Sequence, residues 1–283
     1  MLMQYAHKAL LYEVVLAPKP GLVDRINNGS HHDMDMFTFV DAINALTPYL
    51  YEYSLTGSKH VGTPKELFQK ARKVGYQAEV SMMAATQNVN THKGANFSYA
   101  VILPATAYIL KEKRFEFPFT KEETEEMFQY VSKICSGLVY HDFRHLEDKE
   151  ELSYGETLFK EYGITGIRGV AEAGYPILTH TVMPYLRNHL KKYTTDTEGV
   201  LLHALTLIMS EAEDTNLIHR GGISSYYEVQ SQAKEIFNKS NPLNIRDYLE
   251  NFDQKLIHQH LSPGGAADLL SLSIYLAQLE GLL

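Results

Sequence analysis

Helix-start signals recur along the whole chain, whereas strand signals are almost absent. The sequence TPKE at residues 63–66 combines an N-cap threonine, a proline at the first helical position and a glutamate three residues after the cap. TKEE at 120–123 repeats the cap and its glutamate. No segment shows the apolar–polar alternation of a half-buried strand. We therefore expect an all-α protein, with one compact domain over residues 1–283, roughly ten to twelve helices and an active site in loops and helix ends.

The apolar spacing and the caps locate the helices. Pro48 and Pro104 fall inside two of these segments, where we expect them to bend or divide the helix. A polar stretch over 141–152 is expected to be a loop. The predicted helices cover 2–17, 36–56, 64–85, 94–110, 121–140, 154–162, 175–193, 195–210, 226–238, 245–260 and 263–281.

Charge and cysteine content exclude several classes of function. The net charge is −8, and the basic residues are scattered, so we expect no nucleic-acid partner. The single cysteine, Cys135, excludes a disulfide framework, and its helical spacing with apolar neighbours predicts a buried side chain. No signal pattern and no apolar run of about 18 residues occurs, so we expect a cytoplasmic protein without a membrane partner.

Five polar clusters interrupt the helices, at 18–35, 88–94, 163–174, 211–222 and 262–268. The first places prolines, glycines, carboxylates and cations together in a rigid loop. The second directly precedes an apolar helix, whose free N–H groups favour an anion. Each cluster also has an ordinary interpretation as a turn, a cap or a surface ion pair. Together they indicate an acidic, glycine-lined site with a few cations, which suits a polyphosphate bound with Mg²⁺.

Several common catalytic motifs are absent. The chain contains no Walker A loop, no glycine-rich dinucleotide fingerprint, no nucleophile elbow and no His-Glu-x-x-His zinc motif.

The motifs PKPGLVDR at 18–25, HxMD at 32–35, VNTHKG at 89–94, DTN at 214–216, RGG at 220–222 and SPGGAAD at 262–268 occur in this order. With these motifs in this order, the chain resembles the triphosphoribosyl-dephospho-CoA synthase family. The resemblance implies that ATP gives up adenine and that its triphosphoribosyl group moves to the 2′-hydroxyl of 3′-dephospho-CoA. It also implies that the product is the precursor of the citrate lyase prosthetic group, which a separate transferase passes to a carrier protein of the lyase.

This resemblance, together with the chemistry, leads to predicted roles for individual residues. Cleavage of a ribose–base bond builds positive charge at C1, so a carboxylate, an acid and a base are required. Three carboxylates compete for these roles, namely Glu172, Glu213 and Asp268. The expected Mg²⁺ ligands are Asp33, Asp35 and Asp214. The residues expected to bind the ATP phosphates are His92, Lys93, Arg168 and Arg220, with Lys19 and Arg25 as further candidates. Gly264 and Gly265 are expected to let the bound ligand come close to the backbone.

The chain departs from the family pattern in two glycine-rich loops. Gln87 and Asn88 stand where the family has paired glycines, and Val170 stands where we expect an acidic residue two positions before Glu172. These departures put the geometry of the loops in question more than the class of reaction.

Three alternatives stay open. The same reaction can serve malonate decarboxylase, and the clusters also fit an all-α, Mg²⁺-dependent nucleotide hydrolase. A third alternative is a nucleotide-binding protein without catalysis, which would not need so many carboxylates. The oligomeric state is also open, and a dimer is one option.

Overall fold

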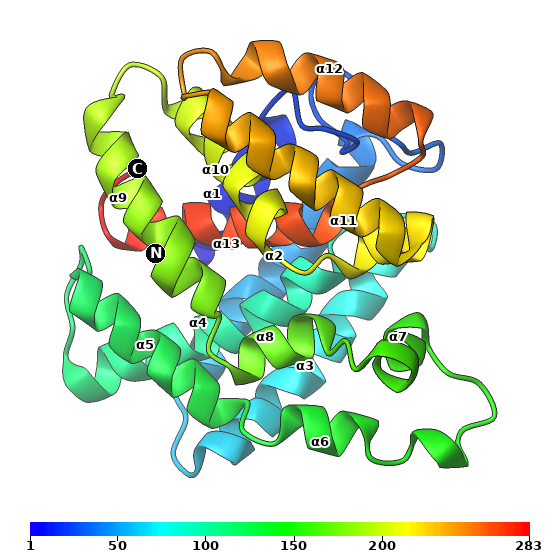
Figure 1. Ribbon diagram of the computed structural model, residues 1–283. Helices are drawn as coiled ribbons and strands as arrows, with labels where there is room; N and C mark the ends of the chain where they lie inside the picture. Colours follow the sequence, from blue (N-terminus) through cyan, green and yellow to red (C-terminus); the bar gives the residue numbers. More distant parts are fainter.

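The computed structural model describes residues 1–283 and contains helices and loops but no β-strand (Figure 1). The predicted all-α class is confirmed. The first half of the chain forms α1 (Leu2–Val15), α2 (Met36–Ser58), α3 (Pro64–Ala85), α4 (Lys93–Lys113), α5 (Lys121–Ile134) and α6 (Leu138–Phe143). The second half forms η1 (Leu146–Asp148), α7 (Tyr154–Tyr162), α8 (Gly166–Glu172), η2 (Leu178–Val182), α9 (Met183–Lys192), α10 (Thr197–Glu211), α11 (Thr215–Lys239), α12 (Ile245–His258) and α13 (Gly264–Leu279).

Helices α4, α10 and α13 form the centre of the molecule, and the other helices cover them. Most residues of these three helices are buried on all sides, as their apolar sequences require. Helix α2 approaches α4 so closely that a Cβ atom at Gly57 would lie 2.1 Å from the carbonyl oxygen of Pro104. Only glycine permits this contact between the two backbones.

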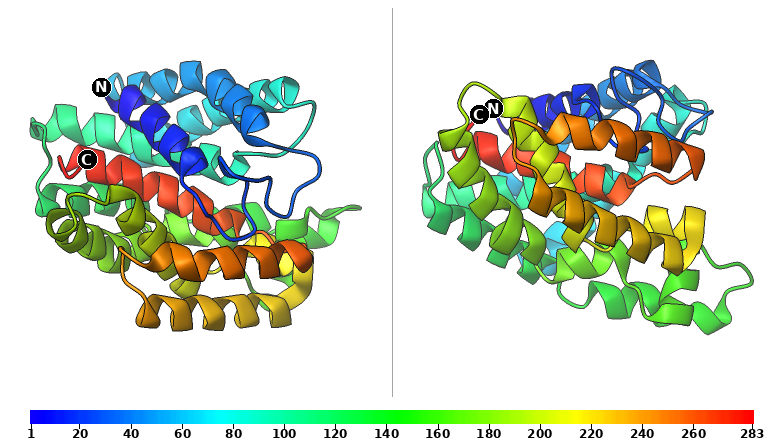
Figure 2. Two further views of the ribbon diagram at one scale, coloured as in Figure 1. Left: turned by 90° about the horizontal axis from the view of Figure 1, so that it is seen from above. Right: turned by 45° about the horizontal axis from the view of Figure 1, so that its top comes forward.

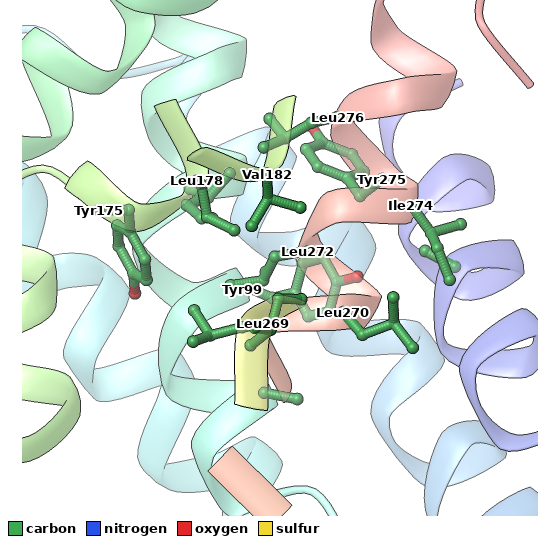
Figure 3. Packing of buried hydrophobic residues seen from close by; sticks show 14 of the residues in the cluster. Tyr99, Tyr175, Leu178, Val182, Leu269, Leu270, Leu272, Ile274, Tyr275 and Leu276 are labelled. Atoms are coloured by element: carbon green, nitrogen blue, oxygen red, sulfur yellow. The ribbon is translucent and has the colours of Figure 1, made fainter. Parts of the chain in front are cut away.

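A single hydrophobic core of 72 buried residues joins the two ends of the chain. In Figure 3, side chains of η2 and α4 surround the buried face of α13. Tyr99 and Tyr275 meet edge to face, with ring centroids 5.8 Å apart. Cys135 is buried in this core, as predicted. Helix α1 lies beside α13, and the Gln278 amide donates to the carbonyl of Tyr5 at 3.0 Å.

Three predicted helices differ from those observed. The helix expected over 121–140 is divided into α5 and α6 at Gly137, whose φ is +78°. The helix expected over 226–238 belongs to the longer α11, which breaks at Gly222 (φ +75°). The segment 175–193 begins with a π-helical turn before Pro184. Pro48 and Pro104, by contrast, lie inside continuous helices.

The loop of residues 16–35, called the opening loop below, joins α1 to α2 and contacts the far end of the chain. In Figure 2, left, this dark blue segment reaches the orange α12 and the beginning of the red α13. The backbone N–H of Gly21 donates to Asp253 of α12 at 2.9 Å, and the Ser30 hydroxyl donates to the carbonyl of Leu261 at 2.6 Å. No helix has both the length and the apolar character needed to cross a membrane.

Candidate functional site

The N-termini of α4, α11 and α13 meet beside the opening loop. The carboxylates of Asp214 and Asp268 lie against these N-termini. Asp214 caps α11, because its Oδ1 accepts the N–H groups of Asn216 (2.9 Å) and Leu217 (3.1 Å). Its Oδ2 accepts the N–H of Ala266 in the first turn of α13 at 2.9 Å. One aspartate therefore joins the beginnings of two helices, where its negative charge interacts favourably with the positive ends of both helix dipoles. Burial still raises the pKa of Asp214 to about 6.

Asp268 projects from the second turn of α13 against the N-terminus of α4. A Cβ atom at Gly94 would lie only 2.0 Å from its Oδ2, so the carboxylate takes the space that a side chain would fill. Although Asp268 keeps a little exposed surface, its carboxyl group lies deep in the protein. Burial raises its pKa well above the ordinary value, with a further contribution from the negative charges of Glu13 and Asp214. Only the N–H of Ala95 opposes this shift.

A buried ion pair joins the opening loop to α1. The Lys19 ammonium group contacts the Glu13 carboxylate, and both side chains are almost fully buried. Asp24 holds the loop in shape, because it accepts the N–H groups of Lys19 (2.9 Å) and Ile26 (2.7 Å). Burial raises the pKa of Glu13, and the charge of Lys19 opposes this shift. Lys19 is thus a buried cation paired with a carboxylate, and its predicted contact with the ATP phosphates stays a prediction.

His92 is the N-cap residue of α4 and is 3 % exposed. Neither of its ring nitrogens has a hydrogen-bond partner, and the hydroxyl of the neighbouring Thr91 has none. The ring packs edge to face on Phe39, with centroids 4.8 Å apart. Burial, together with the nearby Lys19, lowers the pKa of His92 to about 3. The imidazole is therefore neutral at physiological pH, and it can offer a phosphate a hydrogen bond but no charge.

The other predicted cations differ in what they contact. Arg25 pairs with Glu198, and Arg168 donates from Nε to Asp142 at 2.9 Å. The exposed Lys93 pairs with Glu79 at 2.7 Å. Arg220 alone forms no ion pair. Arg25, Lys93 and Arg168 thus pair with three different carboxylates. Each pair depends on which side chains the fold brings together, and the spacing of residues in the sequence does not reveal this.

The predicted metal ligands do not form one set. Asp35 is the N-cap of α2 and accepts from the N–H and the hydroxyl of Thr38, each at 2.8 Å. Asp33 is exposed, with its Oδ1 3.6 Å from Nδ1 of His31. Asp214 is buried, with both oxygens bonded to N–H groups. No three His, Cys, Asp or Glu side chains lie together in a way that could hold a metal ion.

The remaining predicted carboxylates and glycines also have identifiable contacts. Glu172 caps α6, because it accepts the N–H groups of Gly137 (2.7 Å) and Val139 (2.8 Å). Glu213 is exposed and accepts the N–H of Gly166 at 3.3 Å; partial burial raises its pKa. Gly264 and Gly265 make room for protein atoms, since Cβ atoms there would lie 2.8 Å from the Asn216 amide and 3.1 Å from the Asp214 carboxylate.

Sequence reasoning missed Glu13 and Asp253. Glu13 is one acidic residue on the otherwise apolar face of α1, which is a detectable signal, because a buried carboxylate needs a partner. Asp253 accepts from the backbone of Gly21 and from the Asn27 amide, each at 2.9 Å, across more than two hundred residues of sequence. No local pattern could have indicated that contact.

The departure at residues 87 and 88 concerns residue type more than backbone shape. Gln87 (φ +54°) and Asn88 (φ +67°) both adopt the left-handed conformation that glycine favours. Asparagine tolerates this region better than most residues, whereas glutamine does not. Gln87 and Asn88 thus form a turn with the left-handed backbone that paired glycines would adopt without strain.

Buried carboxylates and one buried lysine thus lie where three helices begin, and this arrangement is the candidate active site. Comparison with known proteins shows which family the chain belongs to. The family described as ATP:dephospho-CoA triphosphoribosyl transferase matches the chain over residues 1–283. The chain belongs to this family, which confirms the predicted class of enzyme, a transferase that moves a triphosphoribosyl group to dephospho-CoA.

Curated relatives agree over nearly their whole length. A probable 2-(5″-triphosphoribosyl)-3′-dephosphocoenzyme-A synthase of Streptococcus mutans serotype c is 44 % identical over 287 residues, covering 98 % of this chain and 96 % of the relative. A protein of the same name from Streptococcus equi subsp. zooepidemicus is 45 % identical over 281 residues, covering 97 % and 95 %. One from Streptococcus pyogenes serotype M18 is 44 % identical over 286 residues, covering 99 % and 97 %. No solved structure matches the fold.

Proposed function

We propose that this chain transfers the triphosphoribosyl group of ATP to the 2′-hydroxyl of 3′-dephospho-CoA, with release of adenine, to supply the prosthetic-group precursor of citrate lyase. The family match over the whole chain supports the reaction. The observation that supports its location is the Asp268 carboxyl group, which lies against the N-terminus of α4 with a raised pKa. We further propose that the reaction takes place in the cytoplasm, and that a separate transferase passes the product to the carrier protein of the lyase.

The reaction breaks the bond between ribose C1 and adenine, and forms a bond from C1 to the 2′-oxygen of the acceptor. The electron pair of the broken bond leaves with adenine, which then takes up a proton. The acceptor hydroxyl loses its own proton to a base. Asp268 suits the role of base, because a carboxylate with a raised pKa accepts a proton more readily than an ordinary one. Its negative charge also stabilises the positive charge that develops at C1.

Two other carboxylates are proposed to support Asp268 in different ways. Glu13 of α1 pairs with Lys19 of the opening loop and adds negative charge near Asp268. Glu213, which is exposed and has a raised pKa, is the better candidate for the acid that protonates adenine. Glu172 is a weaker candidate for either role, because both its oxygens accept N–H groups of α6.

We propose that Mg²⁺ arrives with the ATP phosphates, where it would neutralise part of their charge. Magnesium ions at such sites commonly bind one or two protein carboxylates, the substrate phosphates and water. Asp33 fits this role because it is exposed, and Asp35 keeps one oxygen that does not cap α2. Asp214 does not fit, because N–H groups occupy both of its oxygens.

The test is to incubate the purified chain with ATP, Mg²⁺ and 3′-dephospho-CoA and to follow the products by liquid chromatography and mass spectrometry. We expect free adenine and a dephospho-CoA product heavier by one triphosphoribosyl unit. Formation of ADP or inorganic phosphate without adenine would instead support a nucleotide hydrolase. Omission of Mg²⁺ should suppress adenine release, and full activity with a chelator present would contradict the proposed metal.

A further inference from the structure

Arg220 differs from the other cations around the site because its charge has no carboxylate partner. Its Nη1 donates to the carbonyl oxygens of Ser30 (3.2 Å) and His260 (3.3 Å), and its Nη2 donates to Nδ1 of His31 (3.1 Å). All three acceptors are neutral groups. Arg25 and Arg168, by contrast, both contact carboxylates. Arg220 is also exposed, so its charge is both fixed in place and available.

The contact with Arg220 determines the protonation state of His31. A guanidinium group can only donate, so Nδ1 of His31 must accept and carries no proton. The proton of the neutral ring then lies on Nε2, which donates to the hydroxyl of the buried Ser262 at 2.9 Å. The chain Arg220–His31–Ser262 therefore links α11, the opening loop and the start of α13.

The surroundings of Arg220 are open and contain further donors. His32 and His260 are both exposed, and their ring centroids are 6.1 Å apart. Arg220 lies six residues beyond Asp214 in α11, or about 9 Å along the helix axis. An arginine fork held by three acceptors is well suited to bind phosphate oxygens through two parallel hydrogen bonds.

We propose that Arg220, positioned by His31, forms a subsite for the phosphate groups of a polyphosphate ester. This inference rests on the proposed function, which brings two such groups to the enzyme: the triphosphate of ATP and the diphosphate of dephospho-CoA. Arg220 makes the phosphate contact. His31 is a positioning residue, because its Nδ1 holds the guanidinium group toward solvent.

Calorimetric titration of the full chain tests this subsite, with inorganic tripolyphosphate, ATP and dephospho-CoA used as separate ligands. Arg220→Gln should weaken tripolyphosphate binding by roughly 10- to 100-fold, the effect of losing charge-assisted hydrogen bonds. Arg144→Gln is the matched control, since Arg144 at the end of α6 is exposed and forms no hydrogen bond or ion pair. The ligand among ATP and dephospho-CoA that also loses affinity is the one whose phosphates occupy the subsite.

The positioning role of His31 has its own readout. His31→Leu removes the acceptor and should weaken tripolyphosphate binding several-fold, whereas His31→Asn, whose amide oxygen can accept from Arg220, should restore most of the affinity. Far-UV circular dichroism checks that each variant is folded. Unchanged binding of all three ligands to Arg220→Gln would overturn the subsite, and so would an equal loss in Arg144→Gln.

Failure of the subsite and failure of the proposed function are separable. If the wild-type chain releases no adenine while tripolyphosphate binding still depends on Arg220, the reaction is wrong and the subsite stands. If adenine is released while Arg220→Gln binds all three ligands normally, the reaction stands and the subsite is wrong.

Discussion

At the scale of single residues, hydrogen-bond partners distinguish carboxylates that look equivalent in the sequence. Asp35, Glu172 and Asp214 all cap helices and accept two or more hydrogen bonds. Burial raises the pKa of Asp268 well above normal, and the N–H of Ala95 is the one group that lowers this pKa. A buried carboxylate whose negative charge few hydrogen bonds stabilise is a candidate for proton transfer.

Replacement of Asp268 by asparagine should reduce adenine release by roughly 10²- to 10⁴-fold, the usual contribution of a general base. Asparagine has nearly the same size, so the packing against Gly94 should persist. The initial rate of adenine formation measures the effect, and Asp247→Asn, at an exposed position of α12, serves as the control. A variant at position 268 that keeps the wild-type rate would exclude this carboxylate from the chemistry.

His92 should make the stability of the protein depend on pH. Its pKa is about 3 in the folded state, against an ordinary value of 6.5, so the folded protein binds fewer protons than the unfolded chain below pH 6.5. Stability is therefore retained above pH 6.5 and is lost as the pH falls. Between pH 6.5 and 4.5 we expect the free energy of unfolding of the wild type to fall by about 2.5 kcal/mol more than that of His92→Asn.

Urea unfolding at several pH values measures this difference, because asparagine does not titrate and all other groups are shared. Parallel curves for the two proteins would show that the folded environment does not disfavour the charged imidazole.

At the scale of elements, the contact between α4 and α13 depends on the absence of a side chain at Gly94. In Gly94→Ala the new Cβ atom would displace the Asp268 carboxylate, which lies 2.0 Å away. We expect adenine release to fall at least ~10-fold, because a misplaced catalytic group loses much of its effect. Gly75→Ala is the matched control in α3, where the nearest atoms, Cβ of Ala100 and the Tyr53 hydroxyl, lie at an ordinary 3.5 Å.

The control should keep its activity and gain about 0.5–1 kcal/mol of stability, since alanine is favoured over glycine inside a helix. Equal activity in the two variants would mean that the position of the Asp268 carboxylate is not critical.

The beginnings of helices were predicted more accurately than the breaks within them. Thr63 and Thr120 cap helices where we expected, and α2 begins at the predicted residue 36, because a cap depends on residues three positions apart. The interruption at Gly137 was missed. It is accompanied by Glu172, a distant residue that accepts the N–H groups of Gly137 and Val139. The sequence around Gly137 does not indicate such a distant partner.

At the scale of the whole molecule, the first and last helices belong to one core, which includes both Leu2 and Leu279. This supports our prediction of one domain over residues 1–283, which unfolding can test. Near-UV circular dichroism of the tyrosines and far-UV circular dichroism should report one cooperative transition with the same midpoint. Two separated transitions would indicate two folding units.

The sequence by itself determined the all-α class, most helix beginnings and the family, because caps, apolar periodicity and ordered motifs are local or linear properties. It also placed the polar clusters that surround the site. Only the tertiary structure decided which charges compensate one another: Lys19 with Glu13, Arg25 with Glu198, and Arg220 with no carboxylate. The physical reason is that burial and electrostatic pairing depend on distances in space, and the contact of Arg25 with Glu198 joins segments that lie far apart in the sequence.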